Sequence, residues 1–248
     1  MNTEQKLEIS VKNGKQKINK NMKNNIVKDF NLYARSMKNP ISSTTLWDYE
    51  NSMTPYILEE REMRATQMDM FSRLMMERLI WVAGPIMDIT GQILQAQLMY
   101  LDTVSDDDIR VHIDSPGGSV KAGLGIVDVM DYISCDIRTV NTGMAASMGS
   151  VLLACGTKGK RNSLKYSKTM LHQSSGGAVG NIQDARITME EWEKTNKILF
   201  DILGKACGKT SKKVEKDAQR DLWLDANEAL EYGVIDEIIQ NSKVFKKN

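Results

Sequence analysis

The apolar positions between residues 69 and 240 follow two spacings along the chain. Recurrence at every third or fourth position predicts helices, and short apolar or alternating runs predict strands. The predicted helices cover 69–79, 93–101, 120–133, 147–155 and 182–206. The predicted strands cover 80–83, 109–113, 137–140 and 169–172. Alternation of this kind is typical of an α/β fold with right-handed crossovers between parallel strands.

Local signals fix the ends of two of the helices. Gly208 follows the helix predicted over 182–206 and is expected to end it, because glycine adopts the left-handed conformation of a helix C-terminus. Asp225 and Glu228 have the spacing of a capping box, which predicts that a short helix begins after Asp225 and ends at Gly233.

Residues 1–52 have a different pattern from the rest. The range 1–25 is rich in Lys, Asn and Gln and has few apolar residues to bury. We expect 1–52 to be a flexible N-terminal extension and 53–248 to form the compact domain. No aromatic residue lies among the lysines of 12–23, which favours a solvated tail over a nucleic-acid-binding arm.

The composition narrows the class of protein. The net charge of the 248 residues is +1, which predicts attraction neither to nucleic acid nor to a membrane surface. Three cysteines cannot all pair within one chain, and this usage suits a reducing, cytoplasmic location. No apolar run approaches the ~20 residues of a transmembrane helix. No phosphate-binding Gly-x-x-x-x-Gly-Lys-Ser/Thr motif is present, and we expect neither cofactor nor metal.

The stretch 143–149 (GMAASMG) offers the clearest candidate chemistry. Ser147 lies among small residues where a strand is expected to turn into a helix, and the N–H of Met148 would then be free for hydrogen bonding. His172 is one of only two histidines in the chain and lies downstream of Ser147. A serine, a histidine and a carboxylate together can perform acyl transfer. The spacing alone does not select Asp221 over Asp217 or Asp225 as the carboxylate.

A glycine pair provides a second element. After the strand predicted over 109–113, the turn Ser115–Gly118 leaves backbone amides unobstructed. The N–H of Gly118 could join that of Met148 as an oxyanion hole. The alternative is an ordinary Pro-Gly turn, which is common in proteins.

Several further motifs occur in a fixed order along the chain. They are DSPGGS (114–119), AG (122–123), TGMAASMG (142–149), GTKGKR (156–161), MLHQ (170–173), GG (176–177), RD (220–221) and EALEYG (228–233). Together they resemble the motifs of the proteolytic subunits of the bacterial Clp protease. The resemblance covers residues 53 to 239.

The resemblance implies roles for individual residues. It implies Ser147 as the nucleophile, His172 as the general base and Asp221 as the residue that orients the base. It implies Gly118 and Met148 as the oxyanion donors. It also implies that an extended substrate pairs as an added strand with four residues: Ser119, Val120, Ser175 and Gly177.

The resemblance also implies the architecture and the partners. The fold would be a crotonase-like spiral of βαβ units with a protruding strand–helix handle that includes 182–206. Seven subunits would form a ring, and two stacked rings would enclose the active sites. An ATP-dependent Clp unfoldase would feed unfolded polypeptides into this chamber, and the subunit itself would use no cofactor. A long leader suggests self-cleavage between residues 40 and 53.

Some residues depart from the pattern of this family. Ser174 replaces a usual proline, which predicts a looser loop, and Gln219 replaces a usual acidic residue, which predicts weaker stacking of the rings. Polar side chains stand where aromatic ones often line the unfoldase-docking surface, although two apolar side chains remain there. The polar positions are Arg110, His112 and Asn162, and the apolar ones are Tyr132 and Leu164. We expect altered partner choice: a dedicated unfoldase, rings mixed with a paralogous subunit, or poor coupling.

Two other classes of function stay open at this point. One is a non-catalytic or regulatory ring subunit of a mixed Clp complex. The other is a crotonase-fold enzyme acting on acyl-thioesters, which also uses paired backbone amides as an oxyanion hole. A complete serine–histidine–aspartate set argues against both.

Overall fold

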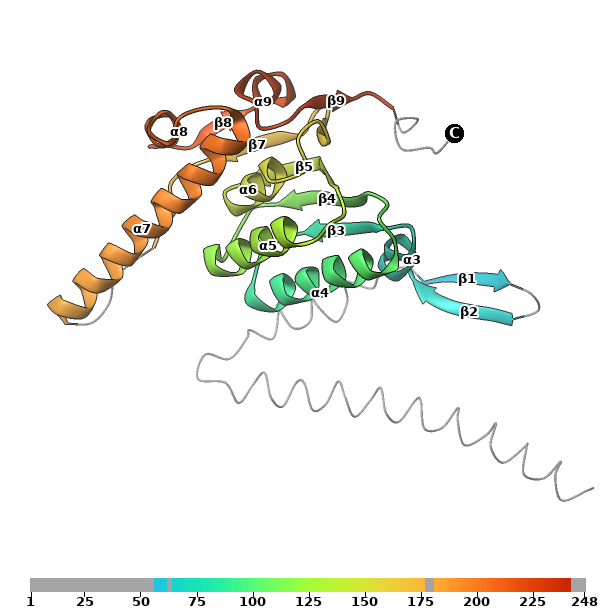
Figure 1. Cartoon of the computed structure of the whole chain (residues 1–248). Coiled ribbons are helices and arrows are strands. Elements are labelled where there is room, and N and C mark those ends of the chain that lie inside the picture. Colours follow the sequence, from blue (N-terminus) through green and yellow to red (C-terminus); the bar gives the residue numbers. More distant parts are fainter. Residues whose placement is uncertain (1–55, 62–63, 177–180, 242–248) are drawn as a thin grey trace, which may run out of the picture. The chain divides into compact units, whose positions relative to one another are not determined.

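The chain divides into two units, Met1–Tyr56 and Ile57–Asn248. The computed structural model describes residues 56–61, 64–176 and 181–241 (Figure 1). The extension predicted for 1–52 and its cleavage region lie outside the described residues. Two short strands, β1 (Tyr56–Arg61) and β2 (Arg64–Asp69), pair with each other in a two-stranded sheet.

A seven-stranded sheet forms the centre of the second unit. Its strands are β3 (Leu79–Ala83), β4 (Ile109–Ser115), β5 (Ile137–Ala146), β6 (Arg161–Leu164), β7 (Lys168–Leu171), β8 (Leu222–Leu224) and β9 (Glu237–Ile239). Strands β3, β4, β5, β6 and β9 lie side by side in that order, and β7 pairs with β5 and β8. All of these pairings are parallel except that of β7 with β8.

Strand β5 is the longest and has two different neighbours on one side. Its first part, Thr139–Asn141, pairs with β6, and its last part, Met144–Ala146, pairs with β7. The sequence pattern predicts only 137–140 as a strand, because the small residues beyond this range have little intrinsic strand preference. Pairing with the distant strand β7 extends β5 up to Ser147.

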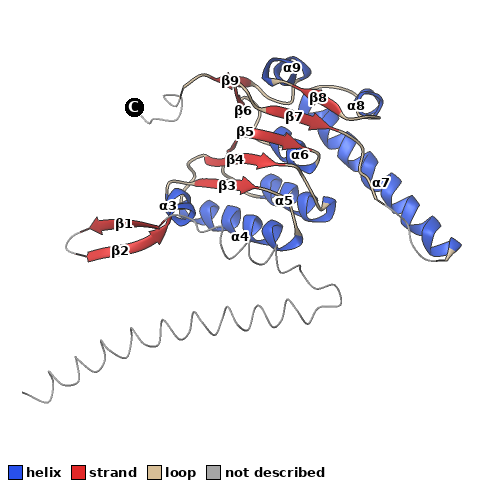
Figure 2. Ribbon diagram, turned by 180° about the vertical axis from the view of Figure 1, so that it is seen from behind, coloured by secondary structure: helices blue, strands red, loops and turns tan. Residues whose placement is uncertain are grey.

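Seven described helices accompany the sheet. They are α3 (Met70–Met76), α4 (Asp88–Val104), α5 (Val120–Tyr132), α6 (Met148–Ala154), α7 (Ile182–Cys207), α8 (Ser211–Asp217) and α9 (Ala226–Tyr232). Figures 1 and 2 show α4, α5 and α6 along one face of the sheet, whereas α7 runs outward beyond it. The α/β fold expected from the sequence is confirmed.

Burial follows the predicted periodicities. Alternate residues of β4, Ile109, Val111 and Ile113, are buried beneath the helices. Leu94, Leu98 and Leu101 form the buried stripe of α4, and every residue of α6 is buried. The sheet and its helices therefore share one apolar core, which fixes the strand ends that carry the polar residues.

The predicted helix ends are also confirmed. Gly208 has a φ of 66° and ends α7, and Gly233 has a φ of 92° and ends α9. The side chain of Asp225 accepts hydrogen bonds at the start of α9, and the side chain of Glu228 accepts the Asp225 N–H. Six short elements, β1, β2, β6, β8, β9 and α8, have no counterpart in the sequence-based prediction.

Candidate active site

Ser147 occupies the turn between β5 and α6. Its φ of 53° and ψ of −122° are unusual for a residue other than glycine and cost about 1–3 kcal/mol. The Ser147 N–H donates to the carbonyl oxygen of Met170 on β7 at 2.9 Å. The turn therefore ties Ser147 to the neighbouring strand, and its side chain remains partly exposed.

His172 and Asp221 lie opposite each other at the end of one ladder. Leu171 of β7 pairs with Leu222 of β8 in antiparallel register. The next facing positions are His172 and Asp221, and the distance from His172 Nδ1 to Asp221 Oδ1 is 3.3 Å. This is longer than the ~2.9 Å typical of such hydrogen bonds. The carboxylate is mostly exposed, and the imidazole is largely covered.

The same strand brings Ser147 to this corner. Ala146 of β5 is the register partner of Met170 of β7 in a parallel pairing. Ser147 and His172 consequently follow the carboxyl ends of adjacent parallel strands. The β5–β7–β8 arrangement gathers Ser147, His172 and Asp221 at one edge of the sheet, although long stretches of chain separate them.

Gly117 packs directly against the serine turn. A Cβ on Gly117 would lie 2.7 Å from the carbonyl oxygen of Ala146, 2.7 Å from Ser147 Cβ and 2.9 Å from the Met148 nitrogen. Only glycine fits this space, and the φ of 90° also favours glycine. The turn at 115–118 is thus held in contact with the turn that carries Ser147.

The N–H groups of Gly118 and Met148 take part neither in the bridge to Ile86 nor in the hydrogen bonds within α6. Gly118 forms a parallel bridge with Ile86, in which Gly117 O accepts from Ile86 N and Ser119 N donates to Ile86 O. In such a bridge the N–H of Gly118 itself points away from Ile86. Met148 is the first residue of α6, so its N–H has no acceptor within the helix.

The four residues expected to pair with substrate have different surroundings. Ser119 caps α5, where its Oγ accepts the Ala122 N–H at 3.2 Å, and Val120 is the first residue of that helix. Ser175 is exposed and, with His172 and Asp221, lines a pocket of about 400 Å³. Gly177 lies outside the described residues.

Comparison with known proteins decides the family. A sequence model described as Clp protease matches residues 60–242, which is more than half of the chain. The chain belongs to the Clp protease family.

Relatives in this Clp protease family are similar over most of their length. A protein of Bacteroides fragilis (strain YCH46) named ATP-dependent Clp protease proteolytic subunit is 48% identical over 215 residues, covering 85% of this chain and 98% of the relative. A protein of Porphyromonas gingivalis (strain W83) with the same name is 50% identical over 192 residues, covering 77% of this chain and 86% of the relative.

Two acidic residues that compete with Asp221 in the sequence are engaged elsewhere in this Clp family member. Asp217 accepts hydrogen bonds from Lys213 Nζ and from the Tyr232 hydroxyl, the latter at 3.0 Å. The Asp225 carboxylate caps α9. Among these three acidic residues, Asp221 is the one beside His172. The position of strand β8 selects it, whereas the sequence spacing does not.

His112 has a structural environment. Its ring packs against Trp81 with 5.2 Å between ring centroids. Burial, aided by the charge of Arg110, lowers the pKa of His112 from 6.5 to about 4, so its imidazole is neutral at pH 7. This agrees with the interpretation of His112 as a structural residue.

The loop at Ser174 differs from the expectation of looseness. The Ser174 N–H donates to Oδ1 of Asn196 on α7 at 2.8 Å, a bond that a proline could not make. The preceding Gln173 N–H donates to the Ala218 carbonyl at 3.1 Å. The sequence alone does not identify Asn196 as a functional residue, because half-buried polar residues are common on long helices.

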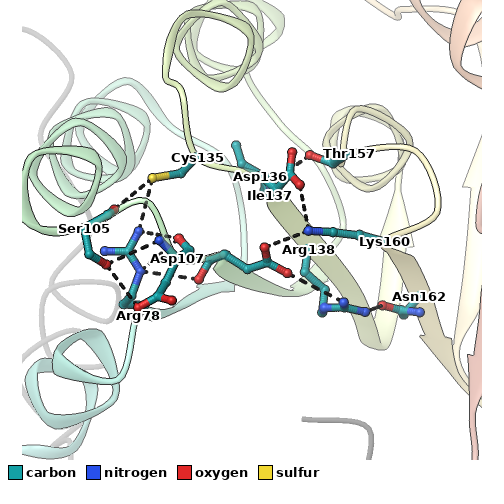
Figure 3. A network of polar contacts seen from close by, with 11 residues as sticks. Arg78, Ser105, Asp107, Cys135, Asp136, Ile137, Arg138, Thr157, Lys160 and Asn162 are labelled. Carbon is teal, nitrogen blue, oxygen red and sulfur yellow. Dashed lines mark hydrogen bonds and ion pairs between the residues drawn. The ribbon is translucent and has the colours of Figure 1, made fainter. Parts of the chain in front are cut away.

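One of the residues expected at a docking surface, Asn162, belongs instead to a buried polar cluster, so the expectation is wrong for this residue. Asn162 is fully buried and its side-chain oxygen accepts from Arg138 at 3.3 Å. Figure 3 shows that Arg138 and Lys160 converge on one carboxylate, and Lys160 Nζ lies 2.7 Å from both Asp108 and Asp136. Tyr132, the apolar position expected at the same surface, is 77% exposed.

No helix in the described ranges 64–176 and 181–241 is long and apolar enough to cross a bilayer. The same ranges contain no group of three or more His, Cys, Asp or Glu side chains arranged to hold a metal ion.

Proposed function

We propose that this chain is the proteolytic subunit of an ATP-dependent Clp protease and hydrolyses peptide bonds of unfolded polypeptides through an acyl-enzyme. Membership of the Clp protease family and the names of its relatives support the activity and the dependence on an ATPase partner. The observation that supports the assignment of residues is the register of β5, β7 and β8, which brings Ser147, His172 and Asp221 to the ends of neighbouring strands.

In this proposal Ser147 is the nucleophile. His172 accepts the proton from the Ser147 hydroxyl as the oxygen attacks the scissile carbonyl carbon, and later donates it to the leaving amine. Asp221 accepts the Nδ1–H of His172, which leaves Nε2 as the basic nitrogen, and its charge stabilises the imidazolium that forms. Water then attacks the acyl-enzyme with His172 as the base again, which releases the acid and restores Ser147.

The oxyanion of each tetrahedral intermediate is bound by the N–H groups of Gly118 and Met148. The close contact of Gly117 with the Ser147 turn supports this assignment, because it brings the turn before Gly118 against the Met148 nitrogen. The N-terminus of α6 adds the positive end of a short helix dipole. Loss of one such donor typically costs about 3–4 kcal/mol of transition-state stabilisation.

The substrate lies in extended form beside Ser119, Val120, Ser175 and Gly177 and pairs through its backbone. Recognition of this kind depends on main-chain hydrogen bonds and gives weak selectivity for side chains. It suits a peptidase that degrades many sequences. Because folded chains do not present such a strand, a Clp-family ATPase supplies the unfolded polypeptide.

The active sites are enclosed when two heptameric rings stack. Residues 1–52 act as a propeptide that is removed autocatalytically between residues 40 and 53. The polar side chains of Arg110 and His112 tune the choice of unfoldase or of a paralogous ring partner, whereas Asn162 is fully buried and is withdrawn from this role. These features follow from the family resemblance and complete the proposed function.

An active-site probe tests the assignment directly. Purified wild type should react covalently with a fluorophosphonate, and native mass spectrometry should find the label on a large assembly. Ser147→Ala should not be labelled at all. Asp221→Asn should be labelled at least a hundredfold more slowly, because the imidazole loses its orienting charge.

Asp217→Asn is the matched control for Asp221→Asn, since Asp217 bonds to Lys213 and Tyr232 and not to His172. Its labelling rate should stay within threefold of wild type. Labelling that persists in Ser147→Ala, or an assembled wild type that is inert to the probe, contradicts the assignment. The inert result would favour a non-catalytic ring subunit.

A further inference from the structure

The backbone that follows His172 is held between two elements. On one side, the Gln173 N–H donates to the carbonyl of Ala218, in the loop that leads to Asp221. On the other side, the Ser174 N–H donates to Oδ1 of Asn196, at 2.8 Å, on helix α7. Both bonds lie within two residues of His172. The imidazole is thus attached to a segment that is fixed from both directions.

A second contact from α7 reaches the same segment. Trp192 and Asn196 are four residues apart in the helix and therefore share one face. A Cβ on Gly176 would lie 2.5 Å from the indole of Trp192, so the Gly176 backbone rests directly on this ring. Residues 174–176 and Trp192 line the same pocket as His172 and Asp221. One face of α7 accordingly supports one wall of that pocket.

The His172–Asp221 contact makes this support significant. The Nδ1–Oδ1 distance of 3.3 Å is long, and the Asp221 side chain is 60% exposed. The carboxylate is therefore weakly held by its own surroundings, and its alignment with the imidazole depends on the backbone segments that carry the two residues. An imidazole misplaced by about 1 Å can cost about a hundredfold in rate.

We propose that Asn196 is a positioning residue for hydrolysis. It fixes the backbone after His172 and thereby makes turnover depend on the position of α7 against that backbone. The inference rests on the proposed serine peptidase function. Asn196 touches no reacting atom, so its contribution appears in kcat and not in KM. The side-chain amide acts through its oxygen, as the acceptor of the Ser174 N–H.

The test uses three changes at two positions in the full-length protein. Asn196→Leu has nearly the same size and lacks the acceptor, whereas Asn196→Asp keeps an acceptor oxygen. Ser174→Pro removes the N–H donor. Each variant is assayed for kcat and KM on a fluorogenic peptide, with native mass and melting temperature measured on the same sample. A lost hydrogen bond of this kind is expected to lower kcat roughly five- to tenfold.

We expect Asn196→Leu to lower kcat by that amount with KM within twofold of wild type, and Asn196→Asp to restore most of the loss. In a Ser174→Pro background, Asn196→Leu should change kcat by less than twofold, because the donor is already absent. A smaller effect of Asn196→Leu in this background identifies the hydrogen bond between Ser174 and Asn196. The comparison does not depend on what effect the proline itself has on kcat.

Three results would overturn the proposal: an unchanged kcat in Asn196→Leu, an equal loss in Asn196→Asp, or an equal effect of Asn196→Leu in both backgrounds. Should Asn196→Leu fail to fold or assemble while Asn196→Asp does so and is fully active, a role in stability alone is indicated and the proposal fails. A wild type without turnover that depends on Ser147 would instead contradict the proposed peptidase function.

Discussion

Charged side chains at the amino ends of β4, β5 and β6 are joined in short pairs, whereas the polar side chains at the carboxyl ends of β5 and β7 are held mainly by backbone. At the amino ends, Lys160 Nζ lies 2.7 Å from both Asp108 and Asp136. At the carboxyl ends, Ser147 has a strained φ, and the one acid–base contact measures 3.3 Å.

The difference separates two tasks within one sheet. The amino ends carry a buried ion pair: Arg161 is 1% exposed, and it contacts Asp236 through Nε at 2.8 Å and Nη2 at 2.6 Å. The carboxyl ends carry the unusual backbone and the exposed carboxylate that the proposed chemistry needs. Substitutions at the first region should change stability, and substitutions at the second should change turnover.

Arg161→Met is expected to have the largest effect on stability. It removes the guanidinium from Asp236, which then keeps only the Lys158 ammonium and two backbone N–H groups, and it leaves the Ala206 carbonyl without its donor. The free energy of unfolding should fall by about 3–5 kcal/mol. Urea unfolding at pH 7 measures this change, and kcat per folded subunit should stay within threefold of wild type. Lys194→Met, which breaks the exposed pair with Glu191, is the control and should cost less than about 1 kcal/mol. Equal losses in the two variants would contradict the prediction.

The pH dependence of the same pair has a defined sign. Burial raises the pKa of Asp236, but hydrogen bonds from Arg161 and its charge outweigh burial and hold this pKa well below its usual value of 3.8. The stability that Asp236 contributes is therefore complete above about pH 4 and is lost on further acidification. Asp236→Asn should flatten this acid dependence.

In contrast to Arg161→Met, Gly117→Ala should have its main effect on turnover rather than on stability. Its Cβ would lie 2.7 Å from Ser147 Cβ, and we expect it to displace the amides that are proposed to bind the oxyanion. We expect kcat/KM to fall roughly a hundred- to thousandfold. Gly159→Ala is the matched control, because Gly159 has a similar φ of 85° but nothing lies within 4 Å of its Cβ position. A comparable loss in both variants would assign the effect to φ alone.

The smallest expected effect concerns His112, on β4 between the two regions. Its pKa of about 4 in the folded chain lies below the value of 6.5 expected when unfolded, so the unfolded chain binds the proton first as the pH falls. Stability should decrease by about 3 kcal/mol between pH 6.5 and pH 4. His112→Phe should remove this slope in urea titrations at several pH values, and His172→Phe should retain it.

Sequence periodicity predicts the elements that local contacts determine. Helix α5 and the ends of α7 and α9 have their predicted positions because caps, glycines and apolar stripes act within a few residues. Strands β8 and β9 have three residues each, too few for a periodic pattern, and they exist through pairing with distant strands. The same applies to the second half of β5, whose small residues resemble a turn until β7 pairs with them.

The candidate site shows the same division. The serine at a strand-to-helix turn and the glycine pair before a helix follow from sequence alone. The selection of Asp221 among its acidic neighbours requires either the family resemblance or the β7–β8 register. Asn196 had no sequence signal, because its partner is a backbone N–H that only the folded chain brings near.

The antiparallel ladder of β7 and β8 has a consequence for the chain between its ends. Since His172 and Asp221 terminate facing strands, the intervening residues leave the sheet and return to their point of departure. The turns of α7 that precede Trp192 lie away from the sheet. Their length does not affect the distance between the imidazole of His172 and the carboxylate of Asp221. Insertions, deletions or substitutions in these turns, whether natural or engineered, can therefore leave the relative positions of His172 and Asp221 unchanged.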